Sequence, residues 1–145
     1  MYPRNAIGKY QQTNAQSDIM DADPHRLIQM LLAGALDRLA IAKGHMQRNE
    51  LRKKGEVLGR AMQIVGALQS SLNLEQGGDI AFNLYRLYDY MMRRLADANR
   101  DNSEDALIEV VDLLKEIKSG WDGIRDEALK LSESQAGRSL SAAGV

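Results

Sequence analysis

The sequence contains no cysteine and only two prolines. The missing cysteine excludes a disulfide scaffold, a cysteine-ligated zinc site, an iron–sulfur cluster and a cysteine nucleophile. Aromatic residues make up 5% of the chain, and no run of about 18 apolar residues is present that would cross a membrane. The 19 basic and 20 acidic residues give a net charge of −1, which is not typical of a nucleic-acid-binding domain. The first twenty residues also lack the apolar run of a signal peptide, so we expect a cytoplasmic protein.

Apolar residues make up 44% of the 145 residues, which is enough for one domain with a core. They recur at spacings of three and four in four stretches, whereas no stretch alternates as a strand would. Helices are expected from Pro24 with Asp23 as N-cap, from about Leu51, from Ile80 after a Gly-Gly stop, and after a Ser103 cap. The pattern predicts an all-α protein, an antiparallel four-helix bundle.

The two ends of the chain are more polar than its middle. We expect a mobile N-terminal arm over residues 1–20, the bundle over residues 21–131 and a disordered tail over residues 132–145. Within the arm, Ile7 and Tyr10 are the strongly apolar pair, and their spacing of three places them on one side of a helical turn.

No arrangement of residues points to catalysis. The two histidines, His25 and His45, do not form the Glu-x-x-His pairs of a di-iron bundle, and no phosphate-binding loop or nucleophile elbow is present. We expect His25 to be solvated and His45 to be a favourable charge at a helix C-terminus. The sequence therefore predicts neither an enzyme, nor a cofactor, nor a metal site.

Charge is unevenly distributed along the chain. Residues 48–60 carry five basic and two acidic side chains, and residues 101–133 carry ten acidic and four basic ones. We interpret both as solvated faces that attract one another across the bundle. No aromatic residues are interleaved in the basic run, so it does not predict nucleic-acid binding.

The apolar arcs of the third and fourth helices are wider than one core requires, and methionine is frequent. Surplus apolar surface indicates a partner or self-association, and methionine suits a surface that accepts apolar helices. The lateral residues expected to form such a groove are Met62, Tyr85, Met92, Leu107 and Val111.

Three glycines, Gly55, Gly59 and Gly66, lie on one side of the second expected helix. They indicate either close approach of another backbone or a helix that is marginal by itself and held by its core face. The sequence leaves both interpretations open.

Several segments resemble the flagellin-specific export chaperones of the FliS family. The resemblance spans about residues 1–130, with a departure at Leu32-Ala33, where many members have Tyr-Asp, and another at Asp23. The matching features are the arm Ile7-x-x-Tyr10, the helix entry Pro24-x-x-Leu27-Ile28-x-Met30-Leu31, the Gly77-Gly78 turn, Ala81-x-Asn83-Leu84, Leu87-Tyr88-x-Tyr90-Met91, Leu95 and Ala98-Asn99.

The resemblance implies a cytoplasmic chaperone, a monomer or weak homodimer, that binds the disordered C-terminal segment of flagellin. It would prevent premature polymerisation and deliver flagellin to the flagellar type III export apparatus. The implied further partners are the flagellar anti-sigma factor and an export-gate protein, with no nucleic acid and no stable membrane insertion. We expect the arm with Ile7 and Tyr10 to act either as a lid on the groove or as a clamp on the client, and the alternative is a disordered terminus that takes no part in binding. A different secretion-system chaperone or adaptor and a self-associating structural bundle are the alternatives.

Overall fold

The computed structural model describes residues 23–131 and 133, and within them it contains helices and turns but no strand. Four long helices follow one another: α2 (Pro24–Gln47), α3 (Leu51–Ser70), α4 (Leu74–Asp101) and α5 (Glu104–Gly123). Ile124 is a turn residue, and residues 125–131 are again helical. The predicted all-α class is confirmed. The expected arm, and the expected tail apart from residue 133, lie outside the described residues.

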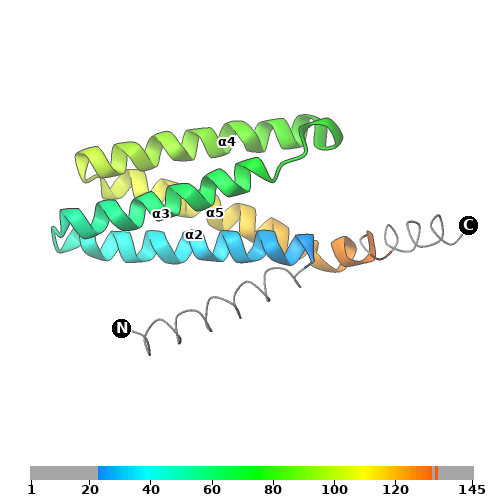
Figure 1. Cartoon of the computed structure of the whole chain (residues 1–145), viewed down its shortest axis with the longest axis horizontal. Helices are drawn as coiled ribbons and strands as arrows, with labels where there is room; N and C mark the ends of the chain where they lie inside the picture. Colours follow the sequence, from blue (N-terminus) through cyan, green and yellow to red (C-terminus); the bar gives the residue numbers. More distant parts are fainter. Residues whose placement is uncertain (1–22, 132, 134–145) are drawn as a thin grey trace, which may run out of the picture. The chain divides into compact units, whose positions relative to one another are not determined.

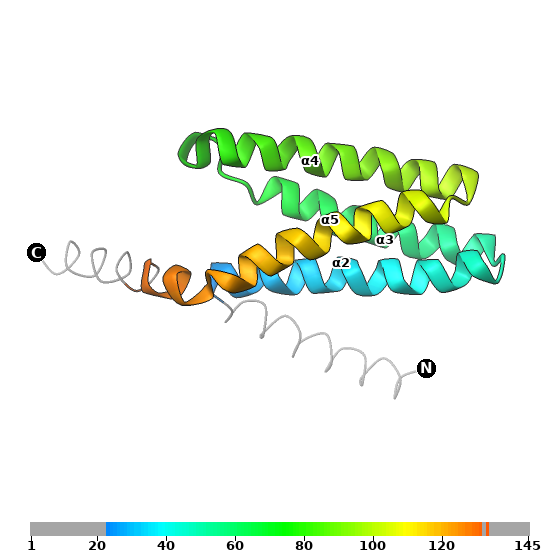
Figure 2. The same ribbon diagram turned by 180° about the vertical axis from the view of Figure 1, so that it is seen from behind.

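Residues 28–123 form one compact unit, which holds most of α2 and the whole of α3, α4 and α5. Its helices run in alternating directions, and α3 and α5 lie between α2 and α4 (Figure 1). The view from behind shows α5 crossing in front of α3 (Figure 2). This arrangement is the antiparallel four-helix bundle that the sequence predicts.

One continuous core fills the space between the four helices. Each helix contributes side chains at helical spacing, and each buried aliphatic side chain is worth about 1.5–3 kcal/mol relative to exposure. The buried members are Leu32, Ala35, Leu39, Ala42 and Met46 of α2, Leu58, Ala61, Val65 and Leu68 of α3, Tyr88, Met91, Leu95 and Ala98 of α4, and Ala106, Leu107, Val110 and Leu114 of α5.

Hydrogen bonds at the starts of α2 and α5 confirm two of the expected N-caps. Asp23 Oδ1 accepts a hydrogen bond from Arg26 N at 2.8 Å, and Ser103 Oγ accepts one from Ala106 N at 3.2 Å. Such bonds satisfy donors that the first helical turn leaves without a partner.

The start of α4 differs from the expectation of a helix from Ile80. Asn73 caps an earlier turn, accepting from Gln76 N at 3.1 Å, and Gly78 then interrupts the helix with φ 54° and ψ −134°. This positive φ, which is expected of the Gly-Gly pair, suits glycine because it has no Cβ. Its neighbour Gly77 is equally constrained, since a Cβ there would lie 2.5 Å from Ala81 Cβ.

The basic run at the start of α3 is not wholly solvated, contrary to the expectation from the sequence. Lys54 is only 3% exposed, and its Nζ donates to Asn99 O at 2.9 Å and to Asn102 Oδ1 at 3.2 Å. Asn102 ends α4 in the left-handed conformation with φ 51°. The ammonium therefore lies at the C-terminal end of α4, where the helix dipole favours a cation.

The described residues before Ile28 and after Gly123 belong to a second unit. There Arg125 Nη2 donates to Asp23 Oδ2 at 3.0 Å, and Arg125 Nη1 lies 3.1 Å from His25 Nδ1. The hydrogen bond from Arg125 is the main cause that lowers the pKa of Asp23. The expectation of a solvated His25 is wrong: the side chain is buried beside Arg125.

Candidate partner-binding face

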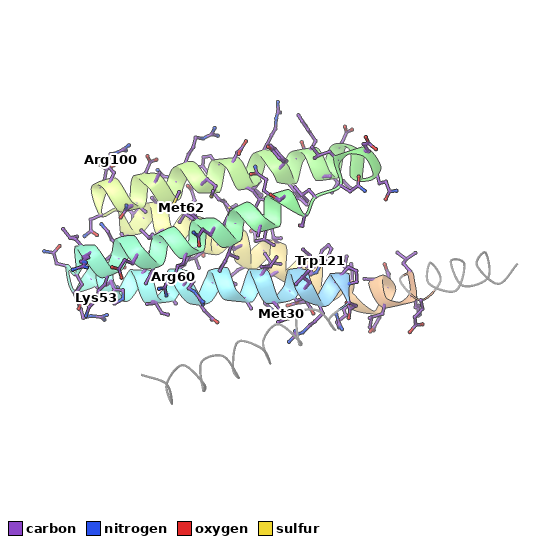
Figure 3. All side chains as sticks on the ribbon, viewed as in Figure 1. Met30, Lys53, Arg60, Met62, Arg100 and Trp121 are labelled. Atoms are coloured by element: carbon purple, nitrogen blue, oxygen red, sulfur yellow. The ribbon has the colours of Figure 1, made fainter. Side chains whose placement is uncertain are left out.

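The structure brings three of the expected partner-binding residues together on one face between α3 and α4. Met62 lies one turn before Gly66 on α3, and a Cβ built on Gly66 would lie 3.9 Å from Met92 Cε of α4. Tyr85 precedes Met92 by two turns and is 37% exposed. Figure 3 shows Met62 between the ribbons of α3 and α4. We call Gly59, Met62, Gly66, Tyr85 and Met92 the α3–α4 face.

A side-chain amide joins the two helices at one end of this face. Gln69 Nε2 of α3 donates to the backbone oxygen of Tyr85 at 3.0 Å and to Asp89 Oδ1 at 2.8 Å. Both acceptors belong to α4, so the amide holds Tyr85 at a set position relative to α3.

Two exposed apolar residues near the start of α4 were not expected. Phe82 is 49% exposed, and the Arg86 guanidinium lies 4.9 Å from its ring centroid. Ile80, which the apolar pattern places on the core stripe, is 76% exposed, whereas the next residue, Ala81, is buried, so the expectation for Ile80 is wrong. Phe82 could have been found from the sequence because it lies three residues before Tyr85 and so shares its side of the helix. The wide apolar arc identified in the sequence did not include it.

Two other expected residues, both of α5, lie elsewhere. Leu107 is fully buried, so the expectation of a lateral position is wrong. It packs one turn before Val110 on the inner side of α5, which the apolar pattern could not separate from the outer side. Val111 is half-buried against the core. Glu109 of α5 faces α4, where it accepts a hydrogen bond from Tyr90. Val111 lies two residues after Glu109, which is about 200° around the helix at about 100° per residue, so Val111 points away from α4 and is not part of the α3–α4 face.

The side of α4 that faces α5 is held by charge and hydrogen bonds. Glu109 accepts from Tyr90 Oη and from Arg94 Nε, both at 2.7 Å. These bonds lower the pKa of Glu109, and the carboxylate raises the pKa of the Tyr90 hydroxyl. Arg94 also contacts Asp97 at 3.1 Å. This network therefore joins α4 to α5 on a side of α4 other than the one that carries Tyr85 and Met92.

Among the described residues, no ion pair joins the basic run 48–60 to the acidic run 101–133, contrary to the expected attraction between them across the bundle. Lys43 and Gln47 of α2 both reach Glu104 of α5, at 4.0 Å and 2.9 Å. Near the end of α2, His45 Nδ1 lies 3.2 Å from Glu50 Oε1. Arg60 lies on the side of α3 toward α2 (Figure 3). The contacts of Glu104 and Glu50 lie at the end of the bundle where α2 ends and α5 begins.

The remaining expected residues, Ile7 and Tyr10, lie outside the described residues. No helix in the part of the chain described here is long and apolar enough to pass through a bilayer. Among the same residues, His, Asp and Glu side chains nowhere gather in a group of three that could hold a metal ion.

The three glycines of α3 do not share one environment. A Cβ on Gly55 would lie 3.7 Å from Asn99 Oδ1 of α4, and one on Gly66 would meet Met92, whereas one on Gly59 would have nothing within 4 Å. Gly55 and Gly66 thus face side chains of α4 at ordinary contact distance. Gly59 leaves open space beside Met62.

Fold and face together define a class: an antiparallel four-helix bundle that carries methionine and tyrosine side chains on the face between two of its helices. The family described as "Flagellar protein FliS" matches residues 6–128. The chain belongs to this FliS family, and it is a flagellar secretion chaperone by family.

Individual relatives agree. The chain is 49% identical over 124 residues to the flagellar secretion chaperone FliSB of Pseudomonas aeruginosa, covering 86% of this chain and 98% of the relative. It is 40% identical to the flagellar secretion chaperone FliS of Vibrio cholerae over 92% of this chain and 98% of the relative. For FliS of Salmonella typhimurium the identity is 41%, over 88% of this chain and 96% of the relative.

Proposed function

We propose that this chain binds the disordered C-terminal segment of flagellin in the cytoplasm, prevents its premature polymerisation and delivers it to the flagellar type III export apparatus. The role is binding without catalysis and needs no cofactor. Family membership supports a secretion client, and the resemblance noted in the sequence supports flagellin.

The observation that carries the proposal is the apolar α3–α4 face. Tyr85 is 37% exposed, and Met62 and Met92 are half-buried beside it, although each would be more stable removed from water. A client helix laid on this face would bury all three side chains. Methionine side chains adapt to different apolar partners, and tyrosine adds a large contact area.

The energetics suit a carrier that must release its load. A disordered client gains affinity from apolar contact and loses part of it to the entropy of ordering. A strongly negative heat-capacity change on binding is the expected mark of that burial. The exposed Phe82 and Ile80 extend the apolar surface toward the start of α4 and offer further contacts for the same client.

The N-terminal residues Ile7 and Tyr10 are proposed to take part in client binding, as a lid that competes or as a clamp that holds. Val111, on another side of the bundle, is proposed to contact a separate part of the client. The flagellar anti-sigma factor and an export-gate protein are proposed as further partners of a monomer or weak homodimer.

Titration calorimetry with a peptide of the flagellin C-terminal segment tests the proposal. One-to-one binding with a strongly negative heat-capacity change is expected, and absence of binding at tens of micromolar peptide would contradict the client. Size-exclusion chromatography with and without the peptide addresses the alternatives. A self-associating bundle would elute as an oligomer without peptide, and a chaperone for another client would stay unchanged when peptide is added.

A further inference from the structure

The sulfur atoms of this chain are all methionine sulfurs, because cysteine is absent. Among the described residues, Met46 and Met91 are buried in the core, whereas Met30, Met62 and Met92 are half-buried. Met91 and Met92 are neighbours in α4, and one points into the core while the other joins the α3–α4 face. The bundle thus separates shielded from accessible methionines within a single helical turn.

The two methionines of the face are half-buried against the core, and the glycines of α3 leave their outer side without a covering side chain. On a helix, the residues three and four positions away in either direction are the neighbours of a side chain. For Met62 these are Leu58 and Val65, which are buried in the core, and Gly59 and Gly66, which carry no side chain that could cover it from the outer side. The Cβ position of Gly59 is surrounded by open space, and that of Gly66 is 3.9 Å from Met92 Cε.

From this geometry we propose that Met62 and Met92 form a peroxide-sensitive pair whose oxidation weakens client binding; this rests on the proposed function. With hydrogen peroxide, the methionine sulfur attacks one oxygen, the O–O bond breaks and an S=O bond forms. The sulfur loses two electrons to the peroxide, whose other oxygen leaves as water with both peroxide protons. Each methionine becomes a sulfoxide, which a sulfoxide reductase returns to the thioether.

Oxidation makes the α3–α4 face more polar, whereas client binding requires an apolar face. A sulfoxide is polar and hydrated, and burying it under an apolar client helix removes water from an oxygen that gains no donor there. Two such groups on one face lower the affinity by at least about tenfold. The buried Met46 and Met91 are protected by the core, so the bundle itself is expected to remain folded.

The test uses the full chain and hydrogen peroxide as oxidant, which is removed before the flagellin C-terminal peptide is added. Peptide mass spectrometry is expected to show oxidation of Met62 and Met92 well before Met46 and Met91. Treated wild type should bind at least about tenfold more weakly, while circular dichroism shows an unchanged fold. The double variant Met62→Leu/Met92→Leu should keep its affinity after the same treatment, and the control Met30→Leu should lose it as wild type does.

Three results would overturn the proposal. These are simultaneous oxidation of buried and face methionines, unchanged binding by wild type oxidised at both positions, and a treated double variant that weakens as much as wild type. Failure of untreated wild type to bind would instead contradict the proposed function. The order of oxidation, which needs no client, would then still decide whether the two face methionines are the reactive ones.

Discussion

The ammonium of Lys54 in α3 donates a hydrogen bond to the backbone oxygen of Asn99 in α4 at 2.9 Å. It also donates to Asn102 Oδ1, so one buried side chain joins the start of α3 to the end of α4 through two neutral oxygens. A polar group buried in this way stabilises only while its bonds are made, because removing one partner leaves the other unsatisfied.

The first prediction concerns this bond. Lys54→Ala is expected to lower the free energy of unfolding by about 2–3 kcal/mol, because the carbonyl of Asn99 loses its donor and the packing of the lysine stem is lost. Lys54→Met keeps the stem and should cost about 1 kcal/mol less. Urea unfolding of both variants measures the difference, and equal stability of Lys54→Ala and wild type would contradict the structural role.

Tyr85 and Tyr88 provide a matched pair on α4. Tyr85→Ala is expected to weaken binding of the flagellin peptide at least about tenfold with little change in stability, because its side chain is 37% exposed. Tyr88→Ala should instead cost about 3–5 kcal/mol of stability, because that side chain is buried. Calorimetric binding and thermal melts separate the two effects. A large loss of stability in Tyr85→Ala would assign this residue to the core.

Gly59→Ala tests whether a client approaches α3 closely. A Cβ there meets no atom within 4 Å, so the variant should gain up to about 1 kcal/mol of stability from helix propensity. Peptide binding should nevertheless weaken, since the methyl group occupies space on the α3–α4 face. Gly120→Ala is the control, because its Cβ is equally unopposed but belongs to α5. Unchanged peptide affinity in Gly59→Ala would move the client off this part of the face.

Acid sensitivity follows from Glu50. Hydrogen bonds from Arg48 and His45 lower the pKa of Glu50 from 4.5 to about 2. Because the folded pKa is the lower one, the stabilising contribution is present at neutral pH and is lost as pH falls from about 4.5 toward about 2. Glu50→Gln should therefore flatten the acid limb of a plot of stability against pH. If the variant loses stability in acid just as wild type does, carboxylates other than Glu50 are responsible for the acid sensitivity.

Deleting residues 1–15 distinguishes the two roles proposed for Ile7 and Tyr10. Tighter peptide binding is expected if the arm is a lid, because a competitor has been removed, and weaker binding if it is a clamp. Titration calorimetry with the flagellin peptide, carried out on the deletion variant and on the full chain, shows whether the affinity rises or falls. Unchanged affinity would contradict both roles.

The sequence by itself determined the helices of the bundle, because helical spacing and caps act between neighbours in the chain. Asp23 and Ser103 cap α2 and α5 as expected, and the stripes that include Leu39, Val65, Leu95 and Val110 are buried. The family follows from the sequence as well, because its motifs are short local patterns that keep their order along the chain.

Only the tertiary structure decided which apolar and charged residues lie inside. Leu107 and Val111 belong to the same wide arc of α5, yet the first is buried fully and the second only in part, because the positions of the neighbouring helices set the boundary of the core. In the sequence Lys54 resembles any surface cation, and its burial depends on the end of α4 lying beside it. Likewise, Met62 and Met92 are 30 residues apart and share a face only because α3 and α4 pack antiparallel and Gly66 separates them without a side chain.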